Sequence, residues 1–305
     1  MTLALQLAVA GLATGSVYAL IALGIVLIYK CSGVVNFAQG AYAMLGAYVS
    51  YVLLGAGLPA VLAVAASMGI MAGIGALTER LVLRPMLKAP VVAVMMVTLG
   101  LLICARAACL AVFGPDQIAF PPVFPEGAVS AGGIFVTYNY IAAGILAAVL
   151  SLGFLAFYAR TPMGLMQRCA ADNSRAALAI GIHVSNQVSA AWAMSAALAG
   201  LAGTLLATLN GLSLGLADIG MLAFPVVVVG GLSSLEGALV AGLVLGVLQS
   251  FTDGLLTPAL EDVLRANTGI YSVGALQQVL PYALLVLMLL LRPQGLFGRR
   301  GAERI

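Results

Sequence analysis

Residues 160–188 read RTPMGLMQRCAADNSRAALAIGIHVSNQV and form a long polar break between two strongly apolar segments. Thr161 and Pro162 are expected to end the preceding helix, because proline lacks a backbone donor and disfavours the α conformation just before it. No residue from 165 to 180 breaks a helix, and Gly181 stands where a C-terminal cap belongs. The stretch therefore predicts one short helix in a polar connection between two long apolar helices.

The predicted helix carries a narrow charged stripe. Arg168, Asp172, Arg175 and Ala179 follow one another at spacings of four, three and four residues, which places them on one face. The opposite face is mostly Met, Cys and Ala. A helix of this kind can dock closely in a groove of another protein. The alternative that this stretch alone leaves open is a solvated connector without a partner.

The composition of the whole chain is that of a membrane protein. Of its 305 residues, 63% are hydrophobic and 8% are charged, against roughly 25% charged in a soluble domain. Such a chain cannot cover a water-exposed surface. The 36 glycines agree with closely packed transmembrane helices, and small-xxx-small pairs occur at Gly11/Gly15, Gly69/Gly73 and Gly242/Gly246.

The apolar segments predict an all-α, polytopic helical membrane protein with a single transmembrane domain over residues 1–305. A straight crossing needs about 20 residues. The sequence contains about nine apolar segments, near 3–29, 37–54, 58–77, 90–113, 138–159, 188–209, 219–232, 235–252 and 273–291. We expect about 8–10 transmembrane helices, with short or broken helices near 33–54 and 219–234.

The cations predict the orientation of the chain in the membrane. If residues 160–187 form a cytoplasmic loop and the segments alternate, eleven of the 13 Lys and Arg residues lie on the cytoplasmic side. This topology puts the N-terminus outside and the C-terminus in the cytoplasm. Residues 114–137 and 253–272 then form outer loops that are moderately acidic and rich in turn-forming residues.

Several kinds of chemistry have no motif in this chain. Neither Lys30 nor Lys88 belongs to a phosphate-binding P-loop, and one histidine, His183, cannot build a multi-histidine metal site. No catalytic cluster, metal site or cofactor site is indicated, and we expect no enzyme activity in this chain. No carboxylate lies convincingly in the middle of an apolar segment, which favours a permease powered by another subunit over a proton-driven carrier.

Two segments are candidates to line a translocation pathway. Asn36, Phe37 and Gln39 interrupt an apolar pattern between glycines, and Gly230 and Gly231 end a short apolar segment. Irregular backbone at membrane depth is tolerated only where protein or a watery cavity covers it. Tight cytoplasmic turns between helices are the alternative for both segments.

The chain resembles the LivH-type permease subunits of bacterial ABC importers for branched-chain amino acids. The resemblance rests on GLATGSVYALIALGIVLIYKCSGVVNFAQG near the N-terminus, AADNSRAALAIGI in the polar loop, FPVVVVGGLSSLEG after it, and LLLRPQGLFG near the C-terminus. These motifs stand in the family's order and extend over essentially the whole chain.

The resemblance implies a permease subunit of the bacterial inner membrane that works by alternating access. The implied partners are a second, LivM-like permease, two cytoplasmic ATPase subunits that hydrolyse ATP, and a periplasmic substrate-binding protein; no nucleic acid is implied. In this interpretation residues 160–187 couple the permease to the ATPase through Arg168, Asp172, Arg175 and Gly181, and the outer loops are periplasmic. Asn36, Phe37, Gln39, Gly230 and Gly231 belong to the pathway.

Two departures and two alternatives remain at this stage. Arg106 stands where the family is expected to have an uncharged side chain, and it either snorkels, pairs with another helix or belongs to the pathway. The coupling loop is reduced in acidic residues, with Asp172 followed by Asn173. The alternative functions are a sibling importer permease for urea, short amides or aromatic acids, and a self-sufficient carrier or channel.

Overall fold

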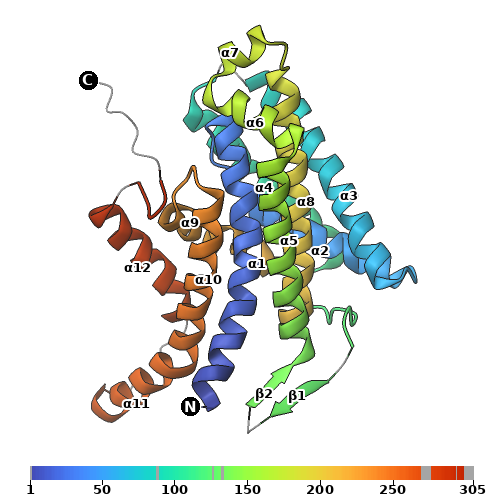
Figure 1. Cartoon of the computed structure of the whole chain (residues 1–305). Helices are drawn as coiled ribbons and strands as arrows, with labels where there is room; N and C mark the ends of the chain where they lie inside the picture. The colour runs from blue at the N-terminus through green and yellow to red at the C-terminus, as the bar shows by residue number, and fades with distance from the viewer. Residues whose placement is uncertain are drawn as a thin grey trace.

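The computed structural model describes residues 2–86, 89–125, 127–131, 134–268, 276–292 and 294–298, which form a bundle of helices (Figure 1). Within these residues, six helices are long and apolar enough to cross a membrane, and shorter apolar helices cover Leu214–Gly230 and Leu276–Leu291. The chain is therefore a multi-pass helical membrane protein, as its composition predicts.

The helices follow the apolar segments of the sequence closely. They are α1 (Thr2–Ser32), α2 (Gln39–Gly55), α3 (Ala60–Thr78), α4 (Val91–Phe113), α5 (Tyr138–Arg160), α6 (Pro162–Asp172), α7 (Ser174–Ala179), α8 (Val184–Asn210), α9 (Ile219–Gly230), α10 (Leu235–Phe251), α11 (Thr257–Thr268) and α12 (Leu276–Leu291). Short π and 3-10 turns join some of them, namely η1 (Glu79–Leu83), η2 (Arg84–Met86), η3 (Leu214–Asp218) and η4 (Thr252–Leu256).

The two predicted irregular regions are confirmed. Residues 33–36 have no regular structure, and α2 begins only at Gln39. α9 has 12 residues, contains Pro225 and ends where Gly231 adopts a φ of 104°. Proline removes one helical hydrogen bond, and the positive φ is readily adopted only by glycine.

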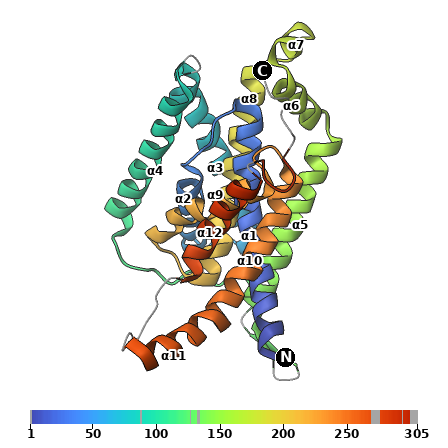
Figure 2. The same ribbon diagram turned by 90° about the vertical axis from the view of Figure 1, so that its left-hand side faces the viewer.

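The centre of the bundle is formed by α1 and α8. In the most apolar 18-residue stretch of each helix, 83% of the residues are buried in α1 and 78% in α8, but only 6% in α4. Figure 1 shows α1 in the middle with α5, α8 and α10 around it, and Figure 2 shows α4 standing apart at the edge. α4 must therefore face lipid or another subunit over most of its surface.

Glycines permit the closest helix contacts. A Cβ added at Gly11 would lie 2.7 Å from the Cα of Val247, and a Cβ added at Gly242 would lie 2.9 Å from the Cα of Ala19. The predicted small-residue pairs on α1 and α10 therefore pack against each other. The third predicted pair, Gly69/Gly73, has nothing within 4 Å of an added Cβ. Among the described residues, this pair therefore makes no packing contact with another helix.

The polar connections gather at two ends of the bundle. α6 and α7 stand at one end, which we call the hairpin end, while the N-terminus of α1 and α11 lie at the other, which we call the N-terminal end (Figure 1). The hairpin end carries most of the described cations, namely Lys30, Arg80, Arg84, Arg160, Arg168, Arg175 and Arg292.

Both predicted outer loops contain more regular structure than expected. In residues 114–137, β1 (Ala128–Ala131) pairs with β2 (Ile134–Thr137) as an antiparallel hairpin. Residues 253–268 are helical, because α10 continues through η4 into α11; residues 269–272 lie outside the described residues. Asp253 lies in the π turn, and Thr257 and Pro258 begin α11. The assignment of both segments to the outer side stays a prediction.

Candidate functional site

The hairpin of α6 and α7 begins as the sequence predicts. α5 ends at Arg160, and the Thr161 Oγ1 accepts a hydrogen bond from the Gly164 amide at 3.2 Å, which caps α6 with Pro162 in its first turn. A Cβ at Gly164 would collide with the backbone of Tyr158. Glycine at this position lets the chain fold back tightly from α5 into α6.

The predicted single helix over residues 165–180 is wrong, because the chain breaks at Asn173. This residue has φ −153° and ψ 98°, and its Oδ1 accepts hydrogen bonds from the amides of Arg175 and Ala176 at 3.1 and 3.0 Å. An asparagine side chain that satisfies two free amides makes a good start for a new helix. Arg168 and Asp172 consequently lie on α6, and Arg175 lies on α7, so they do not share one helix face.

Gly181 ends α7 in the predicted capping position. Its φ is 87°, its amide donates to the Leu178 carbonyl at 3.1 Å, and the next amide, from Ile182, donates to the Ala177 carbonyl at 2.9 Å. These bonds satisfy the last carbonyls of the helix. An added Cβ would meet nothing within 4 Å, so the demand for glycine comes from the backbone and not from packing.

The predicted coupling residues differ in what they contact. The Arg168 guanidinium donates to the Ala159 carbonyl at 2.9 Å and lies 6.0 Å from the centroid of the Tyr158 ring, which ties α6 back to α5. Asp172 and Arg175 are exposed. Arg168 therefore fixes the hairpin, while Asp172 and Arg175 are presented at its surface.

The exposed tip of the hairpin also carries apolar side chains that the stripe prediction did not single out. Leu178 is 59% exposed and Ile180 is 72% exposed, beside Arg175. In the sequence, their alternation with small residues in SRAALAIG could have indicated an apolar surface. Only the break at Asn173 shows which of these side chains point outward. An apolar and cationic tip is suited to contact with another protein.

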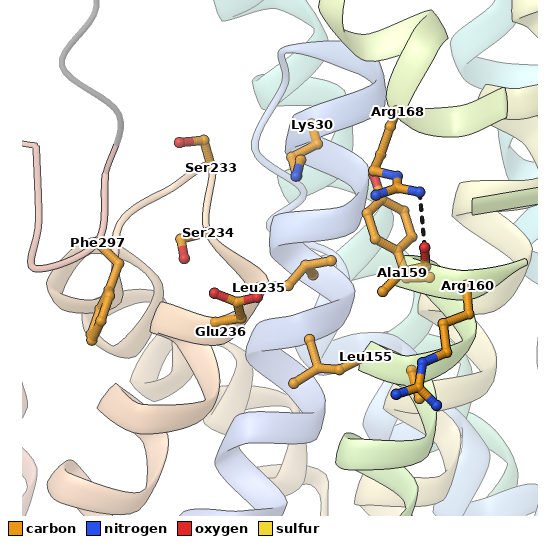
Figure 3. Close-up of a pocket in the computed structure, with 12 residues that line it drawn as sticks. Lys30, Leu155, Ala159, Arg160, Arg168, Ser233, Ser234, Leu235, Glu236 and Phe297 are labelled. Carbon is orange, nitrogen blue, oxygen red and sulfur yellow. Dashed lines mark hydrogen bonds between the residues drawn. The ribbon is translucent and has the colours of Figure 1, made fainter. Parts of the chain in front are cut away.

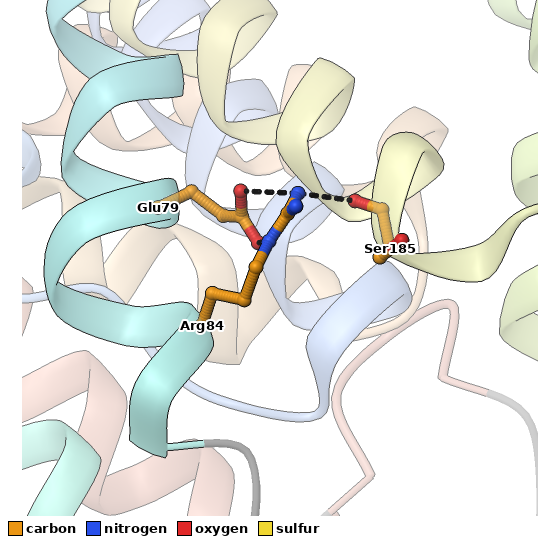
Figure 4. Close-up of polar contacts among 3 residues, drawn as sticks. All are labelled: Glu79, Arg84 and Ser185. Carbon is orange, nitrogen blue, oxygen red and sulfur yellow. Dashed lines mark hydrogen bonds and ion pairs between the residues drawn. The ribbon is translucent and has the colours of Figure 1, made fainter.

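The base of the hairpin is held by a buried carboxylate. Glu79, in η1, is 2% exposed and forms a salt bridge with Arg84, whose Nη2 lies 3.1 Å from Oε2 (Figure 4). The same Nη2 donates to the carbonyl of Ser185 in the first turn of α8 at 3.4 Å. The pair therefore joins the end of α3 to the place where the chain leaves the hairpin.

Asn36 and Gln39 lie in the core and bind each other. They are 1% and 0% exposed, and the Asn36 Nδ2 donates to the Gln39 Oε1 at 3.2 Å. The Gln39 amide group also joins α8, because its Nε2 donates to the Ser195 carbonyl at 3.2 Å and its Oε1 accepts from the Ser195 hydroxyl at 3.0 Å. These amides hold the break before α2 against the centre of the bundle in this conformation.

Phe37 lies at the edge of the same break. Its amide donates to the Thr98 hydroxyl at 3.2 Å, and its ring centroid is 5.8 Å from that of Phe224 on α9. The turn before α2 therefore contacts α4, α8 and α9 at once. Of the three predicted residues here, Phe37 is the one that is only partly buried.

Gly230 and Gly231 contact the C-terminal segment of the described chain. The Val229 carbonyl accepts from the Leu296 amide at 2.8 Å, and the Gly230 carbonyl accepts from the Phe297 amide at 3.2 Å. A Cβ at Gly231 would lie 2.7 Å from the amide nitrogen of Gly298. The GG and GLFG motifs are thus two sides of one backbone contact, and the predicted pathway role of the glycines stays a prediction.

A polar cavity opens at the hairpin end. It has a volume of about 560 Å³ and lies between α1, α5, α6 and the turn before α10 (Figure 3). Lys30, Arg168, Ser233 and Glu236 line it, and a neighbouring cavity of about 380 Å³ shares the first three and adds Asp172. Side chains of both charges here are chemically able to hold a hydrophilic solute or an ordered network of water.

A third polar cavity lies toward the N-terminal end. Its volume is about 530 Å³, and α1, α9, α10 and α12 supply most of its walls, with Gln249 and Asp253 on α10 and η4. None of Asn36, Phe37, Gln39, Gly230 and Gly231 lines any of these three cavities. Sequence reasoning missed this third cavity because its lining comes from segments far apart in the chain.

Arg106 pairs with another element, which is one of the alternatives expected for it. Its Nη1 lies 3.0 Å from the Asp218 Oδ1, and the two side chains are 44% and 61% exposed. The pair links α4 to the 3-10 turn before α9. Within the described part of the chain, no group of three or more His, Cys, Asp or Glu residues is arranged to hold a metal ion.

Comparison with known proteins gives consistent matches over nearly the full length. The family model described as "Branched-chain amino acid transport system / permease component" matches residues 7–289. The chain is 29% identical to the high-affinity branched-chain amino acid transport system permease protein BraD of Pseudomonas aeruginosa, over 99% of this chain and 98% of that protein. It is 28% identical to LivH of Salmonella typhimurium, which carries the same description, over 97% and 96% of the two chains.

Another relative gives a similar match. The probable branched-chain amino acid transport permease protein LivH of Methanocaldococcus jannaschii is 28% identical over 92% of this chain and 88% of that protein. No solved structure matches the chain.

Proposed function

Because this chain belongs to the family of permease components of branched-chain amino acid transport systems, we propose that it is a membrane subunit of an ATP-driven importer for branched-chain amino acids. In this proposal a second, LivM-like permease completes the pathway. Two ATPase subunits bind on the cytoplasmic side, and a substrate-binding protein delivers the amino acid outside. The permease names of BraD and LivH, over nearly the whole chain, support the substrate class.

The observation that carries the proposed coupling is the α6–α7 hairpin. It stands out from the end of the bundle that holds most of the described cations, and Leu178, Ile180 and Arg175 are exposed at its tip. An exposed apolar surface next to charge favours contact with a partner protein. We assign this tip to the ATPase subunits, with Asp172 and Gly181 as further coupling residues.

The connections at the base of the hairpin suggest how a movement is passed on. Arg168 ties α6 to α5, and Arg84 holds the first turn of α8 through the Ser185 carbonyl. Further along α8, Ser195 bonds to Gln39 in the turn before α2. When ATP draws the ATPase subunits together, displacement of the hairpin as a rigid body would shift α5 and α8 and thereby the turn before α2.

The test is transport by the reconstituted complex with a changed hairpin. Gly181→Val forces a β-branched residue into a left-handed conformation, which costs about 1–2 kcal/mol and displaces the end of α7. We expect several-fold less leucine uptake per ATP hydrolysed. Gly57→Val is the matched control, because Gly57 also has a positive φ of 85° and open space around it but lies in the turn between α2 and α3.

Three outcomes discriminate the proposal from its alternatives. An equal ratio of leucine uptake to ATP hydrolysis in Gly181→Val and Gly57→Val would show that α7 does not couple the two processes. Concentrative leucine uptake by the permease without ATPase subunits would indicate a self-sufficient carrier. A binding protein that prefers urea, a short amide or an aromatic acid over leucine would make the complex a sibling importer.

A further inference from the structure

The cavity at the N-terminal end has three kinds of wall. Leu7 on α1 and Ile219 and Leu222 on α9 give it apolar surface. Hydroxyl and amide groups of Tyr18, Tyr140, Gln277 and Gln278 give it hydrogen-bond donors. Asp253 supplies the one carboxylate among the described residues that line it, and none of these residues is cationic.

Asp253 owes its position to a π turn. α10 ends at Phe251, and η4 (Thr252–Leu256) follows without a break in the helical path. The Thr257 hydroxyl donates to the Thr252 carbonyl at 3.0 Å, across the turn. Single π turns inside α-helices occur frequently at functional sites, because they re-aim the side chains around them.

The side chains of α10 that precede Asp253 make hydrogen bonds to other helices, whereas the Asp253 carboxylate is exposed at the cavity. The Gln249 Nε2 donates to the Gln277 carbonyl at 3.1 Å, and the Ser250 hydroxyl donates to the Leu7 carbonyl at 2.7 Å. These bonds hold α10 to α12 and α1 around the cavity. Asp253 is exposed, and it forms no salt bridge with any described residue.

The lining matches the groups of an aliphatic amino acid. Its ammonium group pairs with an unpaired carboxylate, its carboxylate accepts from phenol and amide donors, and its branched side chain lies against the apolar wall. A hydrocarbon chain of a lipid offers no hydrogen-bond partner to the amides and no counter-charge to the carboxylate. A volume of about 530 Å³ is ample for an amino acid with a few water molecules.

We propose that this cavity, with Asp253 as the contact of the ammonium group, is an amino-acid-binding site on the outer side of the permease. The proposal rests on the proposed function and adds to it the place where the permease itself selects an aliphatic amino acid. In the topology proposed for this chain, the cavity opens on the side from which substrate arrives.

The first experiment measures binding of radiolabelled leucine to the purified permease assembly in lipid nanodiscs, without binding protein or ATP. Asp253→Asn removes the charge and keeps the size of the side chain. We expect leucine affinity to fall about tenfold or more, as for loss of one charge-assisted hydrogen bond. Asp262→Asn is the matched control, since Asp262 is an exposed acid on α11 that does not line the cavity, and it should bind like the wild type.

Ligand analogues identify which group Asp253 contacts. Competition by 4-methylpentanoate, which lacks the ammonium group, should be weak and equal in the wild type and in Asp253→Asn. Competition by leucinamide, which keeps the ammonium group, should weaken in Asp253→Asn. If both analogues lose affinity to the same extent, Asp253 does not contact the ammonium group and the proposal is wrong.

A second variant tests the apolar wall. Leu222→Trp fills the space assigned to the branched side chain, so leucine affinity should fall more than alanine affinity. Monodisperse elution and unchanged thermal unfolding show that each variant is folded. Leucine binding that neither Asp253→Asn nor Leu222→Trp alters, or no binding to the folded wild type, would overturn the site.

The two proposals fail in different ways. If ATP-driven leucine uptake persists unchanged in Asp253→Asn and Leu222→Trp, the proposed binding site is refuted, while the proposed importer function stands. If the assembly binds leucine at this site but shows no ATP-driven uptake, the binding site stands and the importer function is refuted.

Discussion

Glu79 and Arg84 show at the scale of single residues how a charge is accommodated at the end of an apolar helix. Glu79 is 2% exposed and Arg84 is 35% exposed, and two contacts of 3.1 and 3.2 Å join them in a fork. The paired geometry offsets the cost of removing the carboxylate from water, which a single hydrogen bond would not do. The two residues are five positions apart in the chain, so their pairing is local, while the contact with Ser185 depends on the tertiary fold.

Removal of the arginine should destabilise the protein more than removal of both partners. In Arg84→Met the Glu79 carboxylate stays buried without a cation, and we expect a loss of about 2 kcal/mol or more, discounted for the exposure of Arg84. The double variant Glu79→Leu/Arg84→Met should recover part of that loss because no buried charge remains. Thermal unfolding of the purified protein in detergent measures both. A double variant less stable than Arg84→Met would contradict this account.

At the scale of helices, close approach through glycine determines which elements form the core. α2 and α8 meet where a Cβ on Gly46 would lie 2.8 Å from the carbonyl carbon and oxygen of Gly200. Next to this contact, the Ser50 and Thr204 hydroxyls hydrogen-bond at 2.7 Å. Helices in a membrane gain little from hydrophobicity against lipid, so such packing and hydrogen bonds hold them together.

A bulky residue at Gly46 should therefore separate α2 from α8. We expect Gly46→Val to lower stability by about 1–3 kcal/mol or more, because the obstructing atoms belong to backbone and cannot move aside. Gly69→Val is the control, since an added Cβ at Gly69 meets no atom of the described residues within 4 Å. Membrane expression and the elution profile of fluorescently tagged variants distinguish the two. Equal loss in both variants would show that packing at Gly46 is not responsible.

The whole molecule is asymmetric in charge along its long direction. Most described Lys and Arg residues lie at the hairpin end, whereas the described residues of the N-terminal end include the acids Asp116 and Asp253. Cations near the ends of membrane helices are retained on the cytoplasmic side. The expected topology puts the α6–α7 hairpin in the cytoplasm and the N-terminus outside.

Labelling of single cysteines tests this orientation. In a variant whose native cysteines are replaced, Asp116→Cys should react with a membrane-impermeant thiol reagent in cells whose inner membrane is intact. Ala176→Cys, at the exposed surface of α7, should react only after that membrane is permeabilised. The reverse pattern would place the hairpin outside and would also exclude its contact with a cytoplasmic ATPase.

Features that depend on neighbouring residues were predictable from sequence. The apolar segments give the membrane class and the approximate helices, and Thr161-Pro162, Gly181 and Gly231 mark ends that the structure reproduces. These features follow from local hydrophobicity and from the backbone angles that proline and glycine permit. The break at Asn173 was equally local, and its capping side chain was the signal that helix periodicity obscured.

Features that depend on distant residues were decided by the tertiary structure alone. Arg106 meets Asp218 across 112 positions, Gln39 meets Ser195 across 156, and residues from α1 to α12 surround the cavity at the N-terminal end. In an almost uniformly apolar sequence, hydrophobicity places every helix in the membrane but does not choose its neighbours. Helix contacts and polar pairs make that choice, and they exist only once the bundle is assembled.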